Sequence, residues 1–521
     1  MIRYFIHKTA IISLLALLAL GATGCNDFLD VEPKHEASEE HQWQTLEDTR
    51  SALMGIYGLM RTALIDNNTL WAVGDLRAGD FTVTSRRDLQ AIADNNLNLN
   101  IRLIDEIADW NRFYAVINAA NVFIERAPGI LGQDKAYSEE NLKYDLAQAR
   151  ALRALAYFEI ARIWGDAPLV TISYDNGSFP DIPQSQQSEI LEYVKQELIS
   201  VANILPFKFG SSNSQYYRQN ADYWHGKLMN KVSVYALLAH VSAMQSRYSD
   251  VETYTSFVLS NQTNIGVSAA NEYITVANLV SPTGYFCGST TTFAANRYLS
   301  FNFMHANNET TATGHLEEWT LAKPYTSKSV PEIYLSRDTL MSMFDDTNDL
   351  RFHFDPEGEK YSTDGFIDMN SQFPIFKKVN VIQDGASKDG DYAVFGSSVS
   401  LTRNEDMALL RAEALAVLNK SSESLILLNT LRAQRGLAAL SMKNDLDNRK
   451  DRLIDEIFKE RRREFVGEGI AWYDLIRRQK LLNDDRDMQA LIDNGGIYWP
   501  VSTKVLENNP LINQNSYWSG K

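Results

Sequence analysis

The chain has 521 residues, of which 45% are hydrophobic and 22% charged, so it can bury a sizeable core and is neither disordered nor collagen-like. Its 66 acidic residues outnumber 50 basic ones, and the formal charge is −16. Long-range repulsion therefore opposes nucleic acid or an anionic membrane surface as the main partner. With two Cys and eight His, the chain has too few ligands for a Cys/His metal cluster, and we expect neither metal nor cofactor.

The first 24 residues are typical of a secretory signal peptide. Arg3 and Lys8 precede an apolar run at residues 11–20, which is shorter than the ~20 residues that cross a bilayer. Small residues at 22–24 are followed directly by Cys25, as in a bacterial lipoprotein signal. We expect cleavage before Cys25 and lipidation of its thiol, which would leave a mature charge of −18 because two basic residues are removed. The alternative is an ordinary cleavage site with an incidental cysteine.

Apolar periodicity predicts helices on both sides of a less regular middle region. Apolar residues recur at spacings of three and four within residues 39–260 and again within 402–480. Residues 261–400 lack this period and are typical of loops and short strands, and a tail follows at 481–521. No linker is long enough to separate domains, so we expect one domain over residues 25–521. The individual helices expected are 144–164, 223–245, 250–259, 405–419, 422–435 and 451–480.

No catalytic motif is complete in this sequence. His35 and Glu36 lack the second His of a zinc-protease motif, and there is neither a P-loop nor a G-x-S-x-G. Gly467 and Gly469 lie in a charged stretch that is predicted to be helical, so they would not cradle a phosphate. A glycosidase needs two carboxylates at a defined separation, which a sequence does not reveal. We therefore expect no enzymatic activity, with a surface glycosidase or peptidase as a less favoured alternative.

Residues 455–477 carry the most specific motif in the chain. They closely resemble the signature of the SusD/RagB family, I-x-x-E-R-x-x-E-[FL]-x-x-E-G-x-R-[WF]-x-D-L, and depart from it where Ala471 replaces the usual Arg. The resemblance implies a mainly α, SusD-like single domain, with tetratricopeptide-like helix pairs and an irregular region of loops and short strands packed on them. Other blocks resemble the family in the same order: 25–30, 149–158, 164–168, 410–414, 428–437, 499–501 and 509–515.

The same resemblance implies a function. SusD-like proteins are lipid-anchored in the outer membrane of Bacteroidetes and exposed at the cell surface. There they form a lid on a SusC-like TonB-dependent transporter and present oligosaccharides to it. We therefore expect a glycan-binding lipoprotein with an oligosaccharide ligand and a transporter partner. A RagB-like lid that captures peptides is the nearest alternative, and a purely structural lid or adhesin is another.

The expected ligand residues are aromatic and polar side chains in loop-like segments of the two regions that build the family's binding platform. Sugar C–H faces stack on aromatic rings, and sugar hydroxyls bond to carboxylate and guanidinium groups. Core packing is the alternative for each aromatic, and Asp75 and Arg77 would alternatively pair with each other. The six expected ligand residues are Trp71, Asp75, Arg77, Tyr285, Phe286 and Trp319.

Most residues of the signature are interpreted as architecture. Arg461 shares a helical face with Ile457 and Phe465, so its side chain is expected to point inward. Trp164 and Trp472 are likewise expected in the core. A buried guanidinium needs a carboxylate partner. The candidates for that partner are Glu464, Glu468 and Glu413.

Overall fold

The computed structural model describes residues 42–174, 179–210, 215–224, 226–268, 272–288, 297–384 and 393–520. The expected signal peptide and Cys25 lie outside these residues. The chain divides into two compact units, Met1–Gln44 and Thr45–Lys521, and the helices and strands described belong to the second unit. Within the ranges given above, no helix combines the length and the apolar character that a bilayer crossing requires.

Helices dominate the second unit, and its strands are short. The α-helices are α2 (Leu46–Ile65), α3 (Thr69–Gly74), α4 (Arg87–Ala93), α5 (Arg102–Ala108), α6 (Asn111–Arg126), α7 (Glu139–Trp164), α8 (Gln187–Ala202), α9 (Ala221–Trp224), α10 (Lys231–Met244), α11 (Tyr248–Ser260), α12 (Val276–Leu279), α13 (Leu316–Thr320), α14 (Arg337–Met343), α15 (Asn404–Val417), α16 (Ser421–Gln434), α17 (Lys450–Phe465), α18 (Ala471–Leu482), α19 (Arg486–Asp493) and α20 (Thr503–Asn508). The mainly α class expected from the sequence is confirmed.

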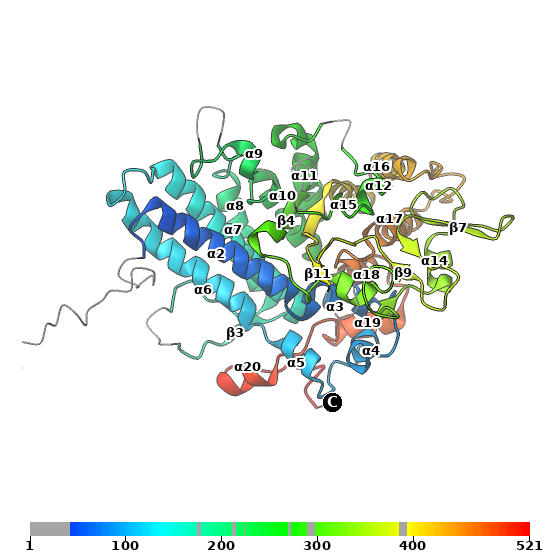
Figure 1. Cartoon of the computed structure of the whole chain (residues 1–521), viewed down its shortest axis with the longest axis horizontal. Coiled ribbons are helices and arrows are strands. Elements are labelled where there is room, and N and C mark those ends of the chain that lie inside the picture. Colours follow the sequence, from blue (N-terminus) through cyan, green and yellow to red (C-terminus); the bar gives the residue numbers. More distant parts are fainter. Residues whose placement is uncertain are drawn as a thin grey trace, which may run out of the picture. The chain divides into compact units, whose positions relative to one another are not determined.

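The long helices form a continuous array in which each packs on a neighbour. Along this array α2 contacts α6, α6 contacts α7, α7 contacts α8, and α8 contacts α10. The array continues through α11, α15, α16, α17 and α18 (Figure 1). Buried alanines such as Ala239 and Ala414 lie among larger apolar side chains where α10, α11 and α15 meet. Small residues at these contacts let the helix axes approach closely, as the expected tetratricopeptide-like pairing requires.

Helix α7 shows how the sequence sets the limits of an element at the centre of the array. Ser138 caps its first turn, because its side chain accepts a hydrogen bond from the backbone N–H of Asn141. Gly165 ends the helix at a φ of 82°, which a residue with a Cβ rarely adopts. Pro168 follows shortly afterwards and favours the extended chain of β2. Nearly every residue from Leu152 to Trp164 is buried, because α6 and α8 cover the helix on both sides.

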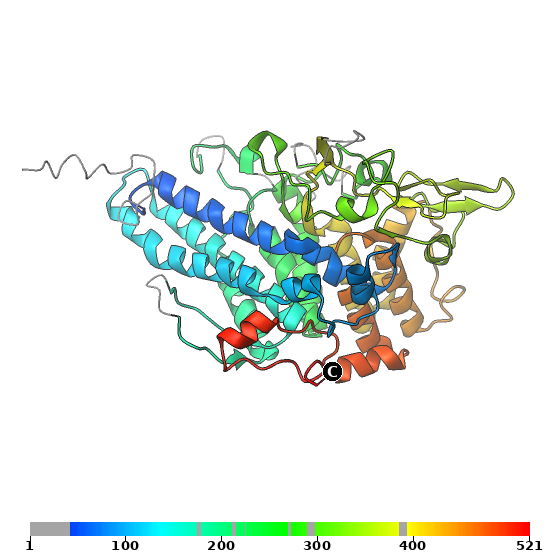
Figure 2. The ribbon, with the colours of Figure 1, turned by 60° about the horizontal axis from the view of Figure 1, so that its bottom comes forward.

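The strands form small antiparallel sheets of two strands each, most of them in the middle of the chain. The longest pair joins β4 and β12, with Val399 opposite Phe301, and β12 runs directly into α15. Figure 2 shows this green and yellow region along one side of the helical array, with the red C-terminal tail on the opposite side. The strands are β1 (Thr82–Val83), β2 (Ala167–Pro168), β3 (Gln184–Ser185), β4 (Arg297–Phe301), β5 (Ile333–Tyr334), β6 (His353–Asp355), β7 (Lys360–Ser362), β8 (Phe366–Ile367), β9 (Ile375–Phe376), β10 (Ile382–Asp384), β11 (Val394–Phe395) and β12 (Val399–Arg403).

One expected helix is two helices in the structure. The segment 451–480 breaks between α17 and α18, where Gly467 and Gly469 both have a φ of 80°. A Cβ on Gly469 would lie 2.6 Å from the side chain of Leu70, so only glycine fits this close approach. The prediction that these glycines lie within a helix is therefore wrong. The turn brings the signature segment against α3, far away in the sequence.

Candidate ligand-binding site

Trp71 and Asp75 lie inside the protein, against the turn between α17 and α18. Trp71 belongs to α3 and not to a loop, it is 4% exposed, and its Nε1–H donates to the carbonyl of Gly467 at 3.2 Å. Asp75 accepts a hydrogen bond from the backbone N–H of Gly469 at 2.6 Å, while its other oxygen has no partner within the described part of the chain. Both side chains therefore secure the signature turn and offer no surface to a sugar.

Arg77 fastens the C-terminal segment to α3 and its neighbours. Its Nη1 donates to the carbonyl of Ile497 at 2.7 Å, and its Nε donates to Asn95 at 2.8 Å. The guanidinium also lies 4.3 Å from the ring centroid of Trp472. Burial lowers the pKa of Arg77 to about 9, because these neutral acceptors do not replace the lost hydration of the cation. Arg77 is 3% exposed, and its hydrogen bonds go to these groups and not to Asp75.

The three aromatics expected in the middle region are also interior. Tyr285 and Phe286 make an edge-to-face contact with ring centroids 5.1 Å apart, and the guanidinium of Arg297 lies over the Tyr285 ring at 5.1 Å. Trp319 lies within the short helix α13 and is 2% exposed. The structure thus corrects the expected stacking surface, because a ring packed on both faces has none left for a ligand. Core packing, the alternative reading, describes all of these aromatic residues.

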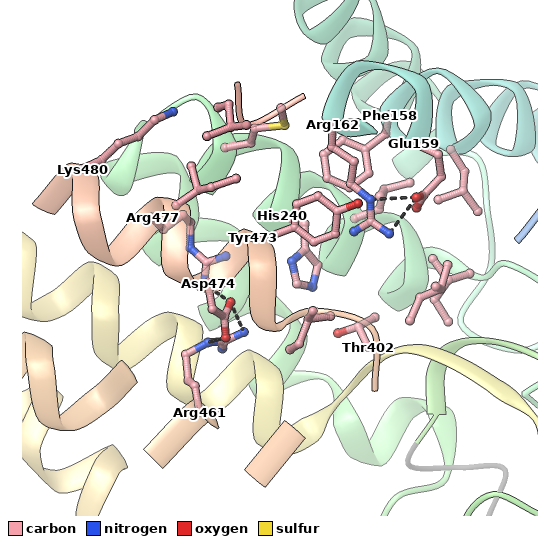
Figure 3. A pocket seen from close by; sticks show the side chains of 18 of the residues that line it. Phe158, Glu159, Arg162, His240, Thr402, Arg461, Tyr473, Asp474, Arg477 and Lys480 are labelled. Carbon is pink, nitrogen blue, oxygen red and sulfur yellow. Dashed lines mark hydrogen bonds and ion pairs between the residues drawn. The ribbon is translucent and has the colours of Figure 1, made fainter. Parts of the chain in front are cut away.

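A small cavity lies between α7, α10 and α18 and is lined by charged side chains (Figure 3). Its volume of about 70 Å³ is room for a few water molecules. Arg162 pairs with Glu159 at 2.7 Å on one side, and Arg461 pairs with Asp474 at 2.7 Å on the other. His240 points between them and contacts Asp406 at 2.8 Å. These charges neutralise one another across the helix array, so we assign the cavity to the scaffold.

The expected inward orientation of Arg461 is confirmed, but its expected partners are wrong. It is 1% exposed and bonds to Asp406 and Asp474, neither of which was among the candidates. Glu464 is instead surrounded by Arg351, Arg403 and Arg435, each at 2.7–2.9 Å. These guanidinium groups hold the pKa of Glu464 well below its usual range despite its complete burial.

The remaining two carboxylate candidates also bind cations other than Arg461. Glu468 bonds to Arg403 and Lys378, and Glu413 bonds to Arg477. Helical spacing predicts which side of a helix is buried. It does not predict which distant helix supplies the partner of a charged group.

A buried Ser–His–Glu cluster lies in the middle region. Ser397 Oγ donates to Glu317 at 2.9 Å, and His315 Nδ1 lies 3.0 Å from the same hydroxyl. Burial lowers the pKa of His315 to about 4 and raises that of Glu317 to about 7. All three side chains are at most 1% exposed, so a substrate would not reach the serine hydroxyl. The cluster is therefore a packing motif and not a nucleophile beside its base.

An open groove with aromatic walls lies beside the C-terminal tail, on the side of the helical array opposite the middle region (Figure 2). We call it the aromatic groove, and its volume is about 220 Å³. Asn111, Tyr114 and Asn118 line it from one face of α6, because spacings of three and four place them along the same side of a helix. The segment between β2 and β3 contributes Tyr174 and Phe179, whose ring centroids are 6.0 Å apart. Phe179 is 70% exposed.

The wall between β2 and β3 is fastened to α6 by a row of polar side chains. Asn118 accepts a hydrogen bond from the backbone N–H of Tyr174 at 3.0 Å, and Glu125 accepts one from the N–H of Ser173 at 2.8 Å. Asn121, between them on the same helix, donates to the carbonyl of Ile172 at 2.8 Å. These bonds hold the backbone that carries Tyr174 in place before a ligand arrives, which lowers the entropy lost on binding.

The tail closes the third side of the aromatic groove. Asn508 and Asn509, at the end of α20, line it together with Ile512. Asn509 Nδ2 donates to the carbonyl of Ile182 at 2.9 Å and so ties the tail to the opposite wall. Among the groove's lining residues that the structure describes, none is Asp, Glu, Lys or Arg. Aromatic faces with neutral amide donors and acceptors suit a neutral, hydroxyl-rich ligand.

Sequence reasoning missed the aromatic groove although its signal was present. Tyr174 and Phe179 flank the polar run Asp175 to Ser178 in a segment without helical period. The same criterion, an aromatic beside polar loop residues, pointed instead to Trp71 and Trp319 because the family's platform was expected there. What distinguishes the two sets is exposure, which depends on how distant segments cover each ring.

Comparison with known proteins places the chain in a family. Residues 359–518 match the model of the SusD family, and residues 27–243 match a second model described as starch-binding and associating with the outer membrane. A SusD superfamily protein from Bacteroides thetaiotaomicron has a similar crystal structure, with 49% identity, a TM-score of 0.84, and coverage of 92% of this chain and 100% of that chain. A SusD-like protein from Formosa agariphila is 27% identical over 98% of this chain and 99% of its own length.

The chain belongs to the SusD family. A structure described as a laminarin-binding SusD-like protein shares the fold with a TM-score of 0.65 at 20% identity. The family resemblance expected from residues 455–477 is therefore confirmed.

Proposed function

We propose that the protein captures neutral oligosaccharides at the cell surface and delivers them to a SusC-like TonB-dependent transporter without chemical change. The aromatic groove is the observation that carries the proposal. It combines the exposed ring of Phe179 and the ring of Tyr174, whose backbone is anchored to α6, with amides from α6 and from the end of α20. Such a site recognises the apolar faces and the hydroxyls of a sugar ring. Membership of the SusD family supports the same function.

Charge supports a neutral ligand. The whole chain carries a formal charge of −16, so its field repels anionic polysaccharides at long range. An anionic sugar would also find no Lys or Arg among the described lining residues of the aromatic groove to replace its lost hydration. A neutral glycan is insensitive to both effects.

The direct test measures glycan affinity and thermal stability on the same variants. A glycan array of the lipid-free protein identifies a ligand, and calorimetry then compares Phe179→Ala and Tyr174→Ala with the wild type. Loss of one stacking ring should weaken binding about thirtyfold, because such an anchor contributes ~2 kcal/mol. The melting temperature of Phe179→Ala should hardly change, because this ring is 70% exposed.

Tyr223→Ala is the matched control, since Tyr223 is a 39% exposed aromatic that does not line the groove. Its glycan affinity should equal that of the wild type. Wild-type affinity in both groove variants would refute this site. If the wild type instead bound a peptide pool and no glycan, and the groove variants lost that binding, the protein would capture peptides and the proposal would be wrong.

Lipid attachment and the transporter partner require separate experiments. We propose that Cys25, which lies outside the described residues, carries the lipid that holds the protein at the outer membrane. Cys25→Ala should then move the protein to the soluble fraction, and mass spectrometry of the wild type should show acyl chains. Affinity purification in gentle detergent should recover a much larger barrel protein. Recovery of this chain alone would contradict its role as a lid.

A further inference from the structure

An ion pair between α7 and α8 reaches the wall of the aromatic groove without lining the groove itself. Glu197 on α8 accepts a hydrogen bond from Nη2 of Arg153 on α7 at 2.7 Å. Arg150, three residues earlier on α7, donates to the same carboxylate at 2.7 Å and 3.1 Å. Burial by itself would raise the pKa of Glu197, but the bonds from both guanidinium groups outweigh it and lower the pKa, so the carboxylate remains charged.

Arg153 connects this ion pair to Asn121 on α6. Its Nη1 donates to Asn121 Oδ1 at 2.6 Å and to the carbonyl of Thr171, in the wall of the groove, at 3.4 Å. The other end of the Asn121 amide, Nδ2, donates to the carbonyl of Ile172 at 2.8 Å. Asn121 is 1% exposed and Arg153 is 6% exposed, so water has little access to either group. The connection therefore runs from a carboxylate on α8 to the backbone two residues before Tyr174.

The guanidinium of Arg153 decides which way the Asn121 amide faces. A guanidinium carries only donors, so it can bond to the oxygen of the amide and not to its NH2 group. With Oδ1 held by Arg153, Nδ2 is the end that faces the carbonyl of Ile172, which needs a donor. A reversed amide would set donor against donor on one side and acceptor against acceptor on the other, and both mismatches would be buried.

We propose that Arg153 is a positioning residue for ligand binding, which acts by orienting Asn121 against the wall that carries Tyr174. This inference rests on the proposed function and deepens it, because it names a residue outside the groove that controls the affinity of the groove. Glu197 holds the guanidinium, the guanidinium orients the amide, and the amide holds Ile172. Without Arg153 the amide is free to turn. The wall would then have to be ordered when a ligand binds, which lowers the affinity.

Hydrogen exchange of the ligand-free protein and calorimetry with laminarihexaose, maltohexaose and cellohexaose test the proposal together. Arg153→Met removes the guanidinium, and exchange of the backbone N–H groups of Ser173 and Tyr174 should become about tenfold faster because the wall opens more often. Glycan affinity should fall about threefold to tenfold, the size of one neutral hydrogen bond. Arg153→Lys still offers a donor to the amide oxygen and should restore much of both properties.

Asn121→Asp separates the orientation of the amide from the pairing of the buried cation. The new carboxylate still bonds to Arg153 but presents an oxygen to the carbonyl of Ile172, so exchange and affinity should change as in Arg153→Met. Arg150→Met is the matched control, because Arg150 bonds to the same Glu197 and its hydrogen bonds among the described residues do not extend to the wall. It should leave both properties at their wild-type values.

Three results would overturn these conclusions, and they differ in what they overturn. Wild-type glycan affinity in Arg153→Met, while binding still requires Phe179, would refute the positioning role and leave the proposed function intact. Equal losses in Arg150→Met and Arg153→Met would also refute that role, because any weakening of the ion pair would then suffice. Binding that does not require Phe179, or a wild type that binds none of the hexasaccharides, would refute the proposed function itself.

Discussion

Replacing Asp75 by Asn should make the folded protein less sensitive to rising pH. Asp75 is 2% exposed, and one of its oxygens has no partner among the described residues. Burial is the main reason that its pKa is raised to about 8, and the N–H of Gly469 and the nearby Lys378 only partly oppose this effect. At pH 7 the folded protein therefore holds a proton on Asp75 that the unfolded chain has released.

The sign and size of the effect follow from these two pKa values. Below pH 4 the group is protonated in both states and contributes no pH dependence. Between about pH 4 and pH 8 only the folded state binds the proton, so stability falls by at most ~1.4 kcal/mol for each pH unit. Above pH 8 both states are ionised and the dependence ends. From pH 5 to pH 7 the loss amounts to ~3 kcal/mol.

Urea denaturation at constant ionic strength measures the effect at pH 5, 6, 7 and 8. Asn can still accept the hydrogen bond from Gly469. Its unpaired amide group lowers the free energy of unfolding by an amount that does not vary with pH. The stability of Asp75→Asn relative to the wild type should therefore rise steadily with pH. Asp338→Asn removes an exposed carboxyl at the start of α14 and serves as the control. A constant difference between Asp75→Asn and the wild type would refute the assignment of a protonated Asp75.

Two further substitutions test the scaffold. Glu464→Gln should lower the free energy of unfolding by ~3–5 kcal/mol, because it removes the buried negative charge that Arg351, Arg403 and Arg435 share. Chemical denaturation measures this change. A loss below ~1 kcal/mol would contradict the role of Glu464 as the buried countercharge. Gly74→Ala should lower the free energy of unfolding by ~1–3 kcal/mol, because its Cβ would lie 2.0 Å from the carbonyl oxygen of Gly469. Gly55→Ala should raise it by up to ~1 kcal/mol, because Gly55 is an exposed position of α2 with open space around its Cβ. Equal melting temperatures for these two glycine variants would refute the close approach of α3 to the signature turn.

Local sequence patterns predicted the helical scaffold because helices are formed by neighbours in the chain. Periodicity placed both ends of α11, α15 and α16 to within two residues. It also placed the C-terminal end of α7, but that helix begins five residues before the expected start at 144, directly after its capping residue Ser138. The first part of the expected helix 223–245 instead contains the separate α9. The same period showed that Arg461 faces inward. Each of these features depends on residues within one or two turns of one another.

Tertiary structure decided which residues are available to a ligand. Asp75 bonds to a residue 394 positions away, and Arg77 bonds to one 420 positions away, so no local pattern could show that both are interior. Trp71 and Phe179 are both aromatics near polar residues, yet one is 4% and the other 70% exposed. The difference arises because the signature turn covers α3, whereas no described segment covers the ring of Phe179 to the same extent. The sequence by itself determines which aromatic and polar side chains the protein has, and long-range packing determines which of them are exposed to a ligand.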